Sequence, residues 1–261
     1  MELPKEYISY SQIRLYQTCP KKYYYSYVQK ISAPLNDKVY LGITFHAAVE
    51  YYLNQKIAGT SPVIDRLLEY FTNFFDESQK KMQIVWDIKA EETRKRGIAF
   101  VRYFMKEIAH TVKPMMVEKE LVAQLPAINV KLKGVIDLVE EDFSITDFKT
   151  TTAKWSKTRI KGSYLQVIIY RYLFEQSFGD VISLLKFKIF YSKNSTHIRH
   201  QEVAIKPKDV DYDYDKMLEI IAHVVDGIRG EVFYKNEGYT CGFCEFKEIC
   251  KNDPPLEPEQ G

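Results

Sequence analysis

Residues 130–149 read Val-Lys-Leu-Lys-Gly-Val-Ile-Asp-Leu-Val-Glu-Glu-Asp-Phe-Ser-Ile-Thr-Asp-Phe-Lys. Two runs rich in β-branched residues flank the acidic turn Glu-Glu-Asp, and this pattern predicts a β-hairpin. Alternate residues of a strand share a face, so Asp147 and Lys149 are expected to point to the same side. A three-residue turn places Asp137 opposite Asp147 on that face. The hairpin therefore brings two carboxylates and a lysine together.

This constellation has two interpretations. Two neighbouring carboxylates repel each other unless a cation joins them, and hard oxygen ligands suit Mg²⁺ or Mn²⁺. Glu118, on the preceding strand, is a candidate third ligand, and a lysine beside the metal can orient or deprotonate a water or stabilise a phosphate. An Asp-x-Lys triplet is also common as an ordinary surface salt bridge, so the triplet alone does not decide between them.

Outward from the hairpin, the hydrophobic periodicity is helical on the N-terminal side and alternates between strand and helix afterwards. Expected helices cover 9–18, 20–28, 39–57, 61–79, 88–111, 162–177 and 208–227, and expected strands cover 115–125, 130–139, 144–149, 182–191 and 197–205. We therefore expect an α/β fold with a mixed central sheet flanked by helices, in which residues 60–112 form a helical insertion. Residues 1–250 are expected to form one domain, and 251–261 a disordered tail.

The composition excludes several classes of protein. The chain has 261 residues, of which 46% are hydrophobic and 28% charged, with a net charge of +2. These values are ordinary for a globular domain and exclude a disordered, collagen-like or coiled-coil chain. No apolar run reaches the ~18 residues of a membrane helix, and the N-terminus has no apolar signal region. We expect a cytoplasmic protein with no membrane association.

The four cysteines are candidate metal ligands, because disulfides are rare in a reducing compartment. Cys241, Cys244 and Cys250 lie close together in the sequence, and Cys19 lies near the other end. Four thiolates can hold Zn²⁺ or a 4Fe-4S cluster. Structural zinc sites usually show two Cys-x2-Cys pairs, whereas this chain has one, so the spacing favours iron–sulfur over zinc. Participation of Cys19 would join the two ends of the chain.

Other candidates are weaker in isolation. Gln166 and Tyr170 share a helical face and can hydrogen-bond a phosphate or a base, although such a pair is more often packing. His46, in an apolar helix, is more often a core residue than a ligand. The stretch 149–161 is basic and contains a tryptophan, which suits a stacked, single-stranded polyanion. Its candidate DNA-binding residues are Lys154, Trp155, Lys157, Arg159 and Lys161.

Taken together, these motifs resemble the PD-(D/E)XK nuclease superfamily, in particular its RecB-like and AddB-like branch with an iron–sulfur cluster, which includes the CRISPR-associated adaptation nucleases. The matching motifs are the segment from Ser9 to Tyr25 around Cys19, Gly42 to His46, Gly134 to Asp137, Asp147 to Lys149, Gln166 to Tyr170, and Cys241 with Cys244 and Cys250. The resemblance covers residues 9–250, and the order and spacing of the motifs are more specific than any one of them.

The resemblance implies a metal-dependent DNA nuclease. Asp137 and Asp147 would hold Mg²⁺ or Mn²⁺, and the shell would be completed by His46, Glu118 and the Phe148 carbonyl. Lys149 would position or activate the attacking water, and Gln166 and Tyr170 would steady the DNA or the lysine. The implied substrate is single-stranded DNA or DNA ends, digested as an exonuclease in the 5′ to 3′ direction.

The resemblance also implies partners in a recombination, repair or CRISPR adaptation complex. An alternative of a different class is a DNA-binding or assembly subunit of a larger DNA-processing complex, with a structural iron–sulfur cluster and no hydrolysis of its own. The alternative predicts DNA binding without metal-dependent cleavage.

Overall fold

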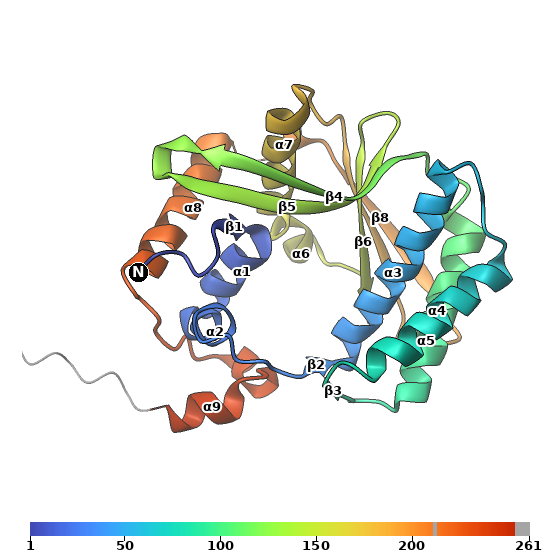
Figure 1. The fold of residues 1–261 in the computed structure, drawn as a ribbon, viewed down its shortest axis with the longest axis horizontal. Coiled ribbons are helices and arrows are strands. Elements are labelled where there is room, and N and C mark those ends of the chain that lie inside the picture. The colour runs from blue at the N-terminus through green and yellow to red at the C-terminus, as the bar shows by residue number, and fades with distance from the viewer. Residues whose placement is uncertain (211–212, 254–261) are drawn as a thin grey trace, which may run out of the picture.

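A computed structural model describes residues 1–210 and 213–253 (Figure 1). Its centre is a mixed six-stranded sheet with the order β1-β5-β6-β7-β8, in which β4 pairs with β5 as a further partner. The strands are β1 (Tyr7–Ser9), β4 (Pro114–Leu125), β5 (Val130–Glu140), β6 (Ile145–Thr151), β7 (Leu185–Tyr191) and β8 (Arg199–Ile205). Strands β4 and β5 run antiparallel, as do β5 and β6, whereas β6 and β7 run parallel. The expected mixed sheet is confirmed.

Helices cover both faces of the sheet. They are α1 (Tyr10–Thr18), α2 (Pro20–Tyr23), α3 (Asp37–Ile57), α4 (Ile64–Gln79), α5 (Ala90–Tyr103), α6 (Lys157–Lys161), α7 (Tyr164–Phe178), α8 (Tyr214–Arg229) and α9 (Lys247–Asn252). Two π-helical turns continue α2 and α5, η1 (Tyr24–Val28) and η2 (Phe104–Ile108), and three 3-10 turns follow later, η3 (Pro126–Ile128), η4 (Pro207–Asp209) and η5 (Tyr239–Phe243). None of the helices within the described ranges is long and apolar enough to cross a bilayer.

The alternation of the strands divides the core into two clusters. On one face Phe187 and Ile189 of β7 pack with buried residues of α1, α7 and α8. On the other face Phe148 of β6 and Phe190 of β7 pack with α3, α4 and α5. The insertion predicted at 60–112 therefore lies on the α3 side of the sheet, opposite α7 and α8.

The two ends of the described chain lie together. Lys21 and Lys22 of α2 form ion pairs with Asp253 and Glu245, and the Tyr25 hydroxyl donates to Asp253. Residues 251–253 are thus ordered against the N-terminal helices, which corrects the start of the expected disordered tail. The rest of that tail, 254–261, lies outside the described residues.

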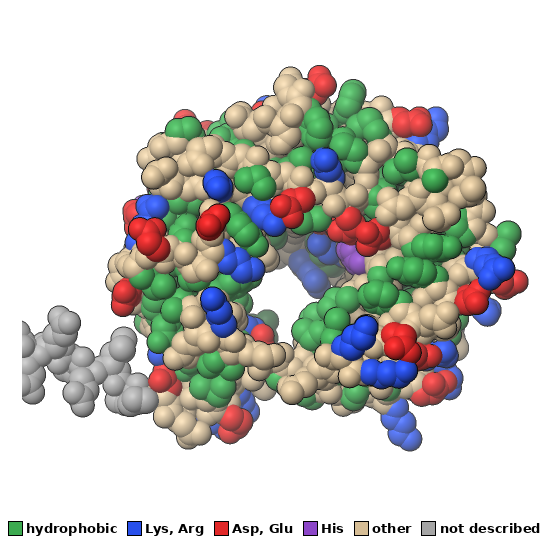
Figure 2. Space-filling view, viewed as in Figure 1, with side chains coloured by type: hydrophobic (Ala, Val, Ile, Leu, Met, Phe, Trp, Pro, Cys, Tyr) green, Lys and Arg blue, Asp and Glu red, His purple; other side chains and the backbone are tan. Residues whose placement is uncertain are grey.

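An opening passes through the molecule in the view of Figure 2. The sheet frames it above, α3 on one side, α1 and α2 on the other, and the short strands β2 (Leu35–Asn36) and β3 (Ile84–Val85) below (Figures 1 and 2). β2 and β3 pair in parallel, and the side chain of Lys38 adds an ion pair to Asp87. The segment that carries β2 therefore connects the two sides of the opening.

Several boundaries differ from the expected ones. The last long helix begins at Tyr214 with Asp213 as its cap, not near 208, because residues 207–209 form a separate 3-10 turn. The helix expected from 61 begins at Ile64, and its cap, Val63, makes no side-chain hydrogen bond. β1 and α6 were not expected from the sequence, because each is too short to show a periodic pattern.

Candidate active site

The hairpin places its acidic residues as predicted. Leu138 pairs with Thr146 and Val139 with Ile145, so continuing this register sets Asp137 opposite Asp147. The backbone ladder ends there, and the Asp137 carboxylate accepts a hydrogen bond from the Phe148 amide at 2.7 Å instead. The open end of the hairpin is thus held by a side chain that also belongs to the site.

One group of potential metal ligands forms at this point. Single ligand atoms of His46, Glu118 and Asp137 all lie within 4.8 Å of one another. The His46 Nδ1 atom is 3.6 Å from an Asp137 oxygen and 3.9 Å from a Glu118 oxygen, while Nε2 is 2.8 Å from the Phe148 carbonyl oxygen. With the proton on Nε2, the hydrogen bond to Phe148 leaves Nδ1 as a lone-pair donor that faces two carboxylates.

Asp147 has different neighbours. It is 1% exposed, and one of its oxygens accepts a hydrogen bond from Gln166 Nε2 at 2.8 Å. The other oxygen lies 2.6 Å from Lys149 Nζ, in an ion pair whose angles do not make a regular hydrogen bond. Gln166 and Lys149 thus hold the Asp147 carboxylate beside the group formed by His46, Glu118 and Asp137, and its role as a metal ligand stays a prediction.

Gln166 and Tyr170 act on Asp147 from α7. Gln166 also donates to the Tyr170 hydroxyl at 3.0 Å, and that hydroxyl donates to the Val135 carbonyl at 2.9 Å. Gly134 lets α7 approach so closely, since a Cβ there would lie 2.6 Å from a methyl carbon of Leu173. The Gln-x-x-x-Tyr motif thus positions the buried carboxylate in this structure.

The electrostatics reflect crowding of negative charge. Burial, with the neighbouring Asp147 carboxylate, raises the pKa of Asp137 to about 7. Burial alone would lower the pKa of His46, but Asp137 and Glu118 outweigh it and raise that pKa to about 9. Burial likewise disfavours the charged form of Lys149. The neighbouring Asp147 and Asp137 carboxylates outweigh this effect, so the pKa of Lys149 is raised. The site stabilises added positive charge.

Glu118 has a backbone conformation that is unusual for its residue type. Its φ angle is +45°, although its neighbours Val117 and Lys119 pair regularly with β5. Positive φ costs a residue with a Cβ ~1–2 kcal/mol. Such strain persists where the surroundings enforce it, and it occurs often at functional sites. Here it accompanies a carboxylate that faces His46.

The donor set fits a divalent metal. One imidazole nitrogen and two carboxylate oxygens are ligands that Mn²⁺ and related ions accept. Burial and the neighbouring Asp147 carboxylate raise the pKa of Asp137, so a cation at this point would offset crowded negative charge. The buried Asp147 oxygen without a regular hydrogen bond is a further oxygen ligand close by.

Comparison with known proteins agrees with this geometry. The model of the PD-(D/E)XK nuclease superfamily matches residues 7–251. The chain belongs to the PD-(D/E)XK nuclease superfamily. Nucleases of this superfamily use divalent metals, so membership indicates a hydrolytic nuclease. No curated protein matches the sequence.

One solved structure shows the same fold, and a second is similar over about half of its length. A candidate exonuclease from Eubacterium rectale is 15% identical, with a TM-score of 0.56, and the match covers 98% of this chain and 91% of that one. The protein SSO0001 is 17% identical, with a TM-score of 0.38, over 52% of this chain and 58% of that one. At such identities the first match shows the shared fold alone.

The basic stretch of this nuclease is divided by the structure. Lys154, Lys157 and Lys161 are exposed, whereas Trp155 is 6% exposed and packs against Phe187. The guanidinium of Arg159 lies over the Trp155 ring, 4.7 Å from its centroid. The expectation that Trp155 offers an open face to a base is wrong for this conformation, because the core and Arg159 cover the ring.

The four cysteines line one cavity of about 810 Å³ where the chain ends meet. Cys241 is exposed, and Cys19, Cys244 and Cys250 are half-buried free thiols. Within the described ranges, no three cysteine sulfurs lie within 4.8 Å of one another. The structure thus brings the predicted ligands to one place without closing them into a tight group.

Two side chains near the site were not singled out from the sequence. Glu50 follows His46 by one helical turn on α3, and burial, with the nearby Glu118, raises its pKa. Arg14 of α1 lines the cavity beside Lys149. The i, i+4 spacing to His46 could have indicated Glu50, whereas nothing local to Arg14 distinguishes it from a solvated arginine.

Proposed function

We propose that this protein is a metal-dependent deoxyribonuclease that acts as an exonuclease on single-stranded DNA or DNA ends, in the 5′ to 3′ direction, with Mg²⁺ or Mn²⁺ at the site. The observation that carries the proposal is the convergence of His46, Glu118 and Asp137 next to the Asp147–Lys149 ion pair. This arrangement supplies metal ligands and a fixed cation within one superfamily motif. Residues 1–250 would act as one nuclease unit, with 60–112 as its insertion.

The residues divide the work of phosphodiester hydrolysis. His46, Glu118 and Asp137, with Asp147 and the Phe148 carbonyl adjacent, would hold the ion, which when bound polarises the scissile phosphate and lowers the pKa of a water. Lys149 holds a positive charge toward the phosphate and orients the attacking water.

The Asp147 carboxylate fixes the position of the lysine in turn. The hydrogen bond from Gln166 holds that carboxylate on the α7 side, and Gln166 in turn donates to the Tyr170 hydroxyl, which helps to fix its amide. Loss of Gln166 would leave a buried carboxylate short of a donor.

The opening through the molecule supports action on free ends. Side chains of Lys, Arg and His lie at its rim in Figure 2. The continuous chain between α2 and α3, with the β2–β3 pair, closes its lower side. A strand that reaches the site through this opening must enter by an end, so a closed circle would be excluded.

The cysteine cavity supports a 4Fe-4S cluster better than zinc. A single zinc at ~2.3 Å from each sulfur requires sulfurs ~3.8 Å apart. In a 4Fe-4S cluster each thiolate binds a different iron, so the sulfurs stand farther apart, as the open arrangement of Cys19, Cys241, Cys244 and Cys250 would allow. The cluster would reinforce ion pairs that already join the chain ends. We also propose that the protein acts with partners in a repair, recombination or CRISPR adaptation complex.

The experiment uses anaerobically purified protein with linear single-stranded DNA, labelled at the 5′ or the 3′ end, and a closed single-stranded circle. Mn²⁺-dependent loss of the linear DNA, with early release of the 5′ label as small products and an intact circle, is expected. Cleavage of the circle would refute the end requirement, and early release of the 3′ label would refute the direction. DNA binding without any cleavage would favour the assembly-subunit alternative.

A further inference from the structure

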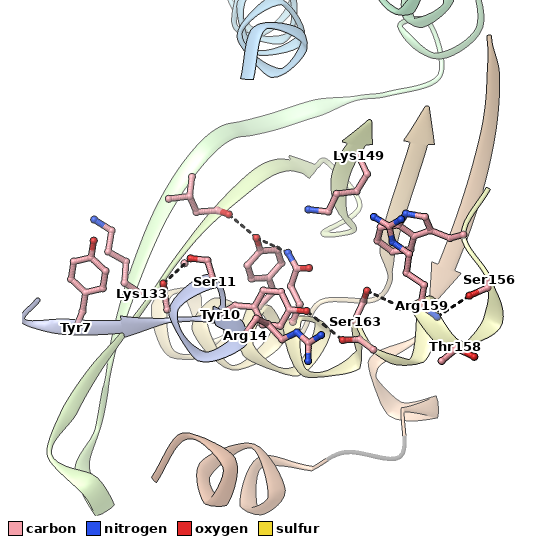
Figure 3. A pocket seen from close by; sticks show the side chains of 17 residues that line it. Tyr7, Tyr10, Ser11, Arg14, Lys133, Lys149, Ser156, Thr158, Arg159 and Ser163 are labelled. Carbon is pink, nitrogen blue, oxygen red and sulfur yellow. Dashed lines mark hydrogen bonds between the residues drawn. The ribbon is translucent and has the colours of Figure 1, made fainter. Parts of the chain in front are cut away.

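A cavity on the α7 side of Lys149 has a charge pattern that the metal site does not use. It has a volume of about 970 Å³, and its walls come from β1, β5, α1, α6 and α7 (Figure 3). Four basic side chains and five serine or threonine side chains line it, and its described lining contains no Asp or Glu. The basic residues are Arg14, Lys133, Lys149 and Arg159. Such a lining suits a polyanion that also forms many hydrogen bonds.

Two of the four cations are already compensated. Lys133 pairs with Glu120 at 2.7 Å, and Lys149 pairs with Asp147 at 2.6 Å. Arg14 and Arg159 have no carboxylate within 4.0 Å in the part of the chain that the structure describes. The positive charge that the cavity offers to a ligand therefore comes mainly from two arginines on different helices.

Arg159 is held in a fixed orientation. Its guanidinium stacks on Trp155, and partial burial lowers its pKa with no acid opposing the shift. The Trp155 ring is 6% exposed and also lines the cavity, and its buried Nε1–H has no acceptor among the described residues. The stacked guanidinium presents its N–H donors in a fixed orientation, which suits a phosphate group.

We propose that this cavity binds the DNA backbone phosphate next to the scissile one, with Arg14 and Arg159 as its charged contacts and Trp155 as the support of Arg159. The inference rests on the proposed function, because the cavity shares Lys149, Gln166 and Tyr170 with the candidate active site. His46, Glu118 and Asp137 do not line it, so the second phosphate would lie apart from the metal ligands. The cavity thereby fixes the position of the strand relative to the metal.

This assignment differs from a general basic surface. Lys154, Lys157 and Lys161 belong to the same basic stretch but do not line the cavity. Substitution of Arg159 should therefore weaken DNA binding more than substitution of any of these lysines, although all four side chains carry the same charge. Ser11, labelled in Figure 3, also lines the cavity and can hydrogen-bond phosphate oxygens, whereas the Ser163 hydroxyl donates to the Arg159 carbonyl.

The test measures binding of a short single-stranded oligonucleotide in EDTA, where no hydrolysis is expected, at several salt concentrations. Arg14→Gln and Arg159→Gln should each weaken binding several-fold and reduce the slope of log K against log salt by ~0.7, the value for one lost phosphate contact on single strands. Arg199→Gln is the matched control, since Arg199 is an exposed arginine of β8 outside the cavity. Equal effects of Arg199→Gln and Arg159→Gln would overturn the proposal.

Two further measurements guard against a folding artefact. Trp155→Phe keeps an aromatic ring but removes the indole N–H and part of the surface that supports Arg159, so binding, measured well below the lowered thermal midpoint of this variant, should weaken. In the wild type, one neutral methylphosphonate in the oligonucleotide should weaken binding as much as Arg159→Gln does, and the two changes combined should weaken it no further. Additive losses at every phosphate position would refute a defined subsite.

The outcomes separate the two levels of inference. A wild type that does not bind single-stranded DNA would refute the proposed substrate. A wild type that binds and cleaves DNA, with Arg14 and Arg159 variants indistinguishable from the control, would refute the cavity assignment alone.

Discussion

The strained backbone at Glu118 predicts that glycine is more stable than alanine at this position, the reverse of the order expected at neighbouring positions of the strand. We compare Glu118→Ala with Glu118→Gly, because both remove the carboxylate and differ mainly in their tolerance of the +45° φ angle. Alanine should retain the penalty of ~1–2 kcal/mol that positive φ imposes on a residue with a Cβ. Glycine avoids that penalty but loses ~0.5–1 kcal/mol because its unfolded chain is more flexible. Glu118→Gly should therefore be the more stable variant, by about 0.5–1 kcal/mol.

Glu120 provides the matched control on the same strand. It pairs regularly with Val135 and has no positive φ angle, and it forms one surface ion pair that both substitutions remove. At this position alanine should be more stable than glycine by ~0.5–1 kcal/mol. The Gly-minus-Ala difference in the free energy of unfolding at position 118, compared with that at position 120, then isolates the backbone penalty at Glu118, about 1–2 kcal/mol.

The assay is urea unfolding of the four variants in EDTA, followed by far-ultraviolet circular dichroism, with unchanged slopes required. Both Glu118 variants should lose Mn²⁺-dependent cleavage to the same extent, since the carboxylate is absent in each. A Glu118→Gly variant that is less stable than Glu118→Ala by the margin seen at Glu120 would refute the strain. Cleavage retained by either Glu118 variant would refute its role in the metal site.

Three other predictions concern protonation, packing and the cysteines. The pKa of His46 is raised to about 9 and that of Asp137 to about 7, so the folded metal-free protein binds these protons more tightly than the unfolded chain does. Its thermal midpoint in EDTA should therefore fall as the pH rises from 6.5 to 9. The affinity for Mn²⁺, measured by calorimetry, should rise over the same range. A flat profile in both would contradict the clustering of these groups. Gly134→Val should lower the free energy of unfolding by ~1–3 kcal/mol in urea titrations, because β5 and α7 leave no room for a side chain, and an unchanged midpoint would refute that close contact. Cys244→Ala should lower the thermal midpoint and the bound iron more than the rate of cleavage per folded molecule; an iron-free variant as heat-stable as the wild type would contradict a structural cluster.

The hairpin was predictable because its information is local. Strand parity and turn length are sufficient to set Asp137 opposite Asp147 and to put Lys149 on the same face. The long helices were likewise visible in their periodicity. The order and spacing of several weak motifs identified the superfamily, which no single motif could do.

The features that escaped prediction depend on contacts distant in sequence. β1 is three residues long, and its pairing with β5 defines it as a strand. The pairing of Asp147 with both Lys149 and Gln166 depends on the packing of α7 over the hairpin. Arg14 lies within the segment around Cys19 that resembles the family, but its place in the cavity follows from the packing of α1 against α7 and α8.

The most direct test of the account measures phosphodiester hydrolysis with and without metal in the wild type and in Lys149→Ala. Purified protein is incubated with end-labelled linear single-stranded DNA and increasing Mn²⁺, and EDTA serves as the blank. Cleavage should rise with Mn²⁺, vanish in EDTA and be lost in a folded Lys149→Ala variant that still binds DNA. Equal cleavage by that variant, or cleavage by the wild type that persists in EDTA, would contradict it.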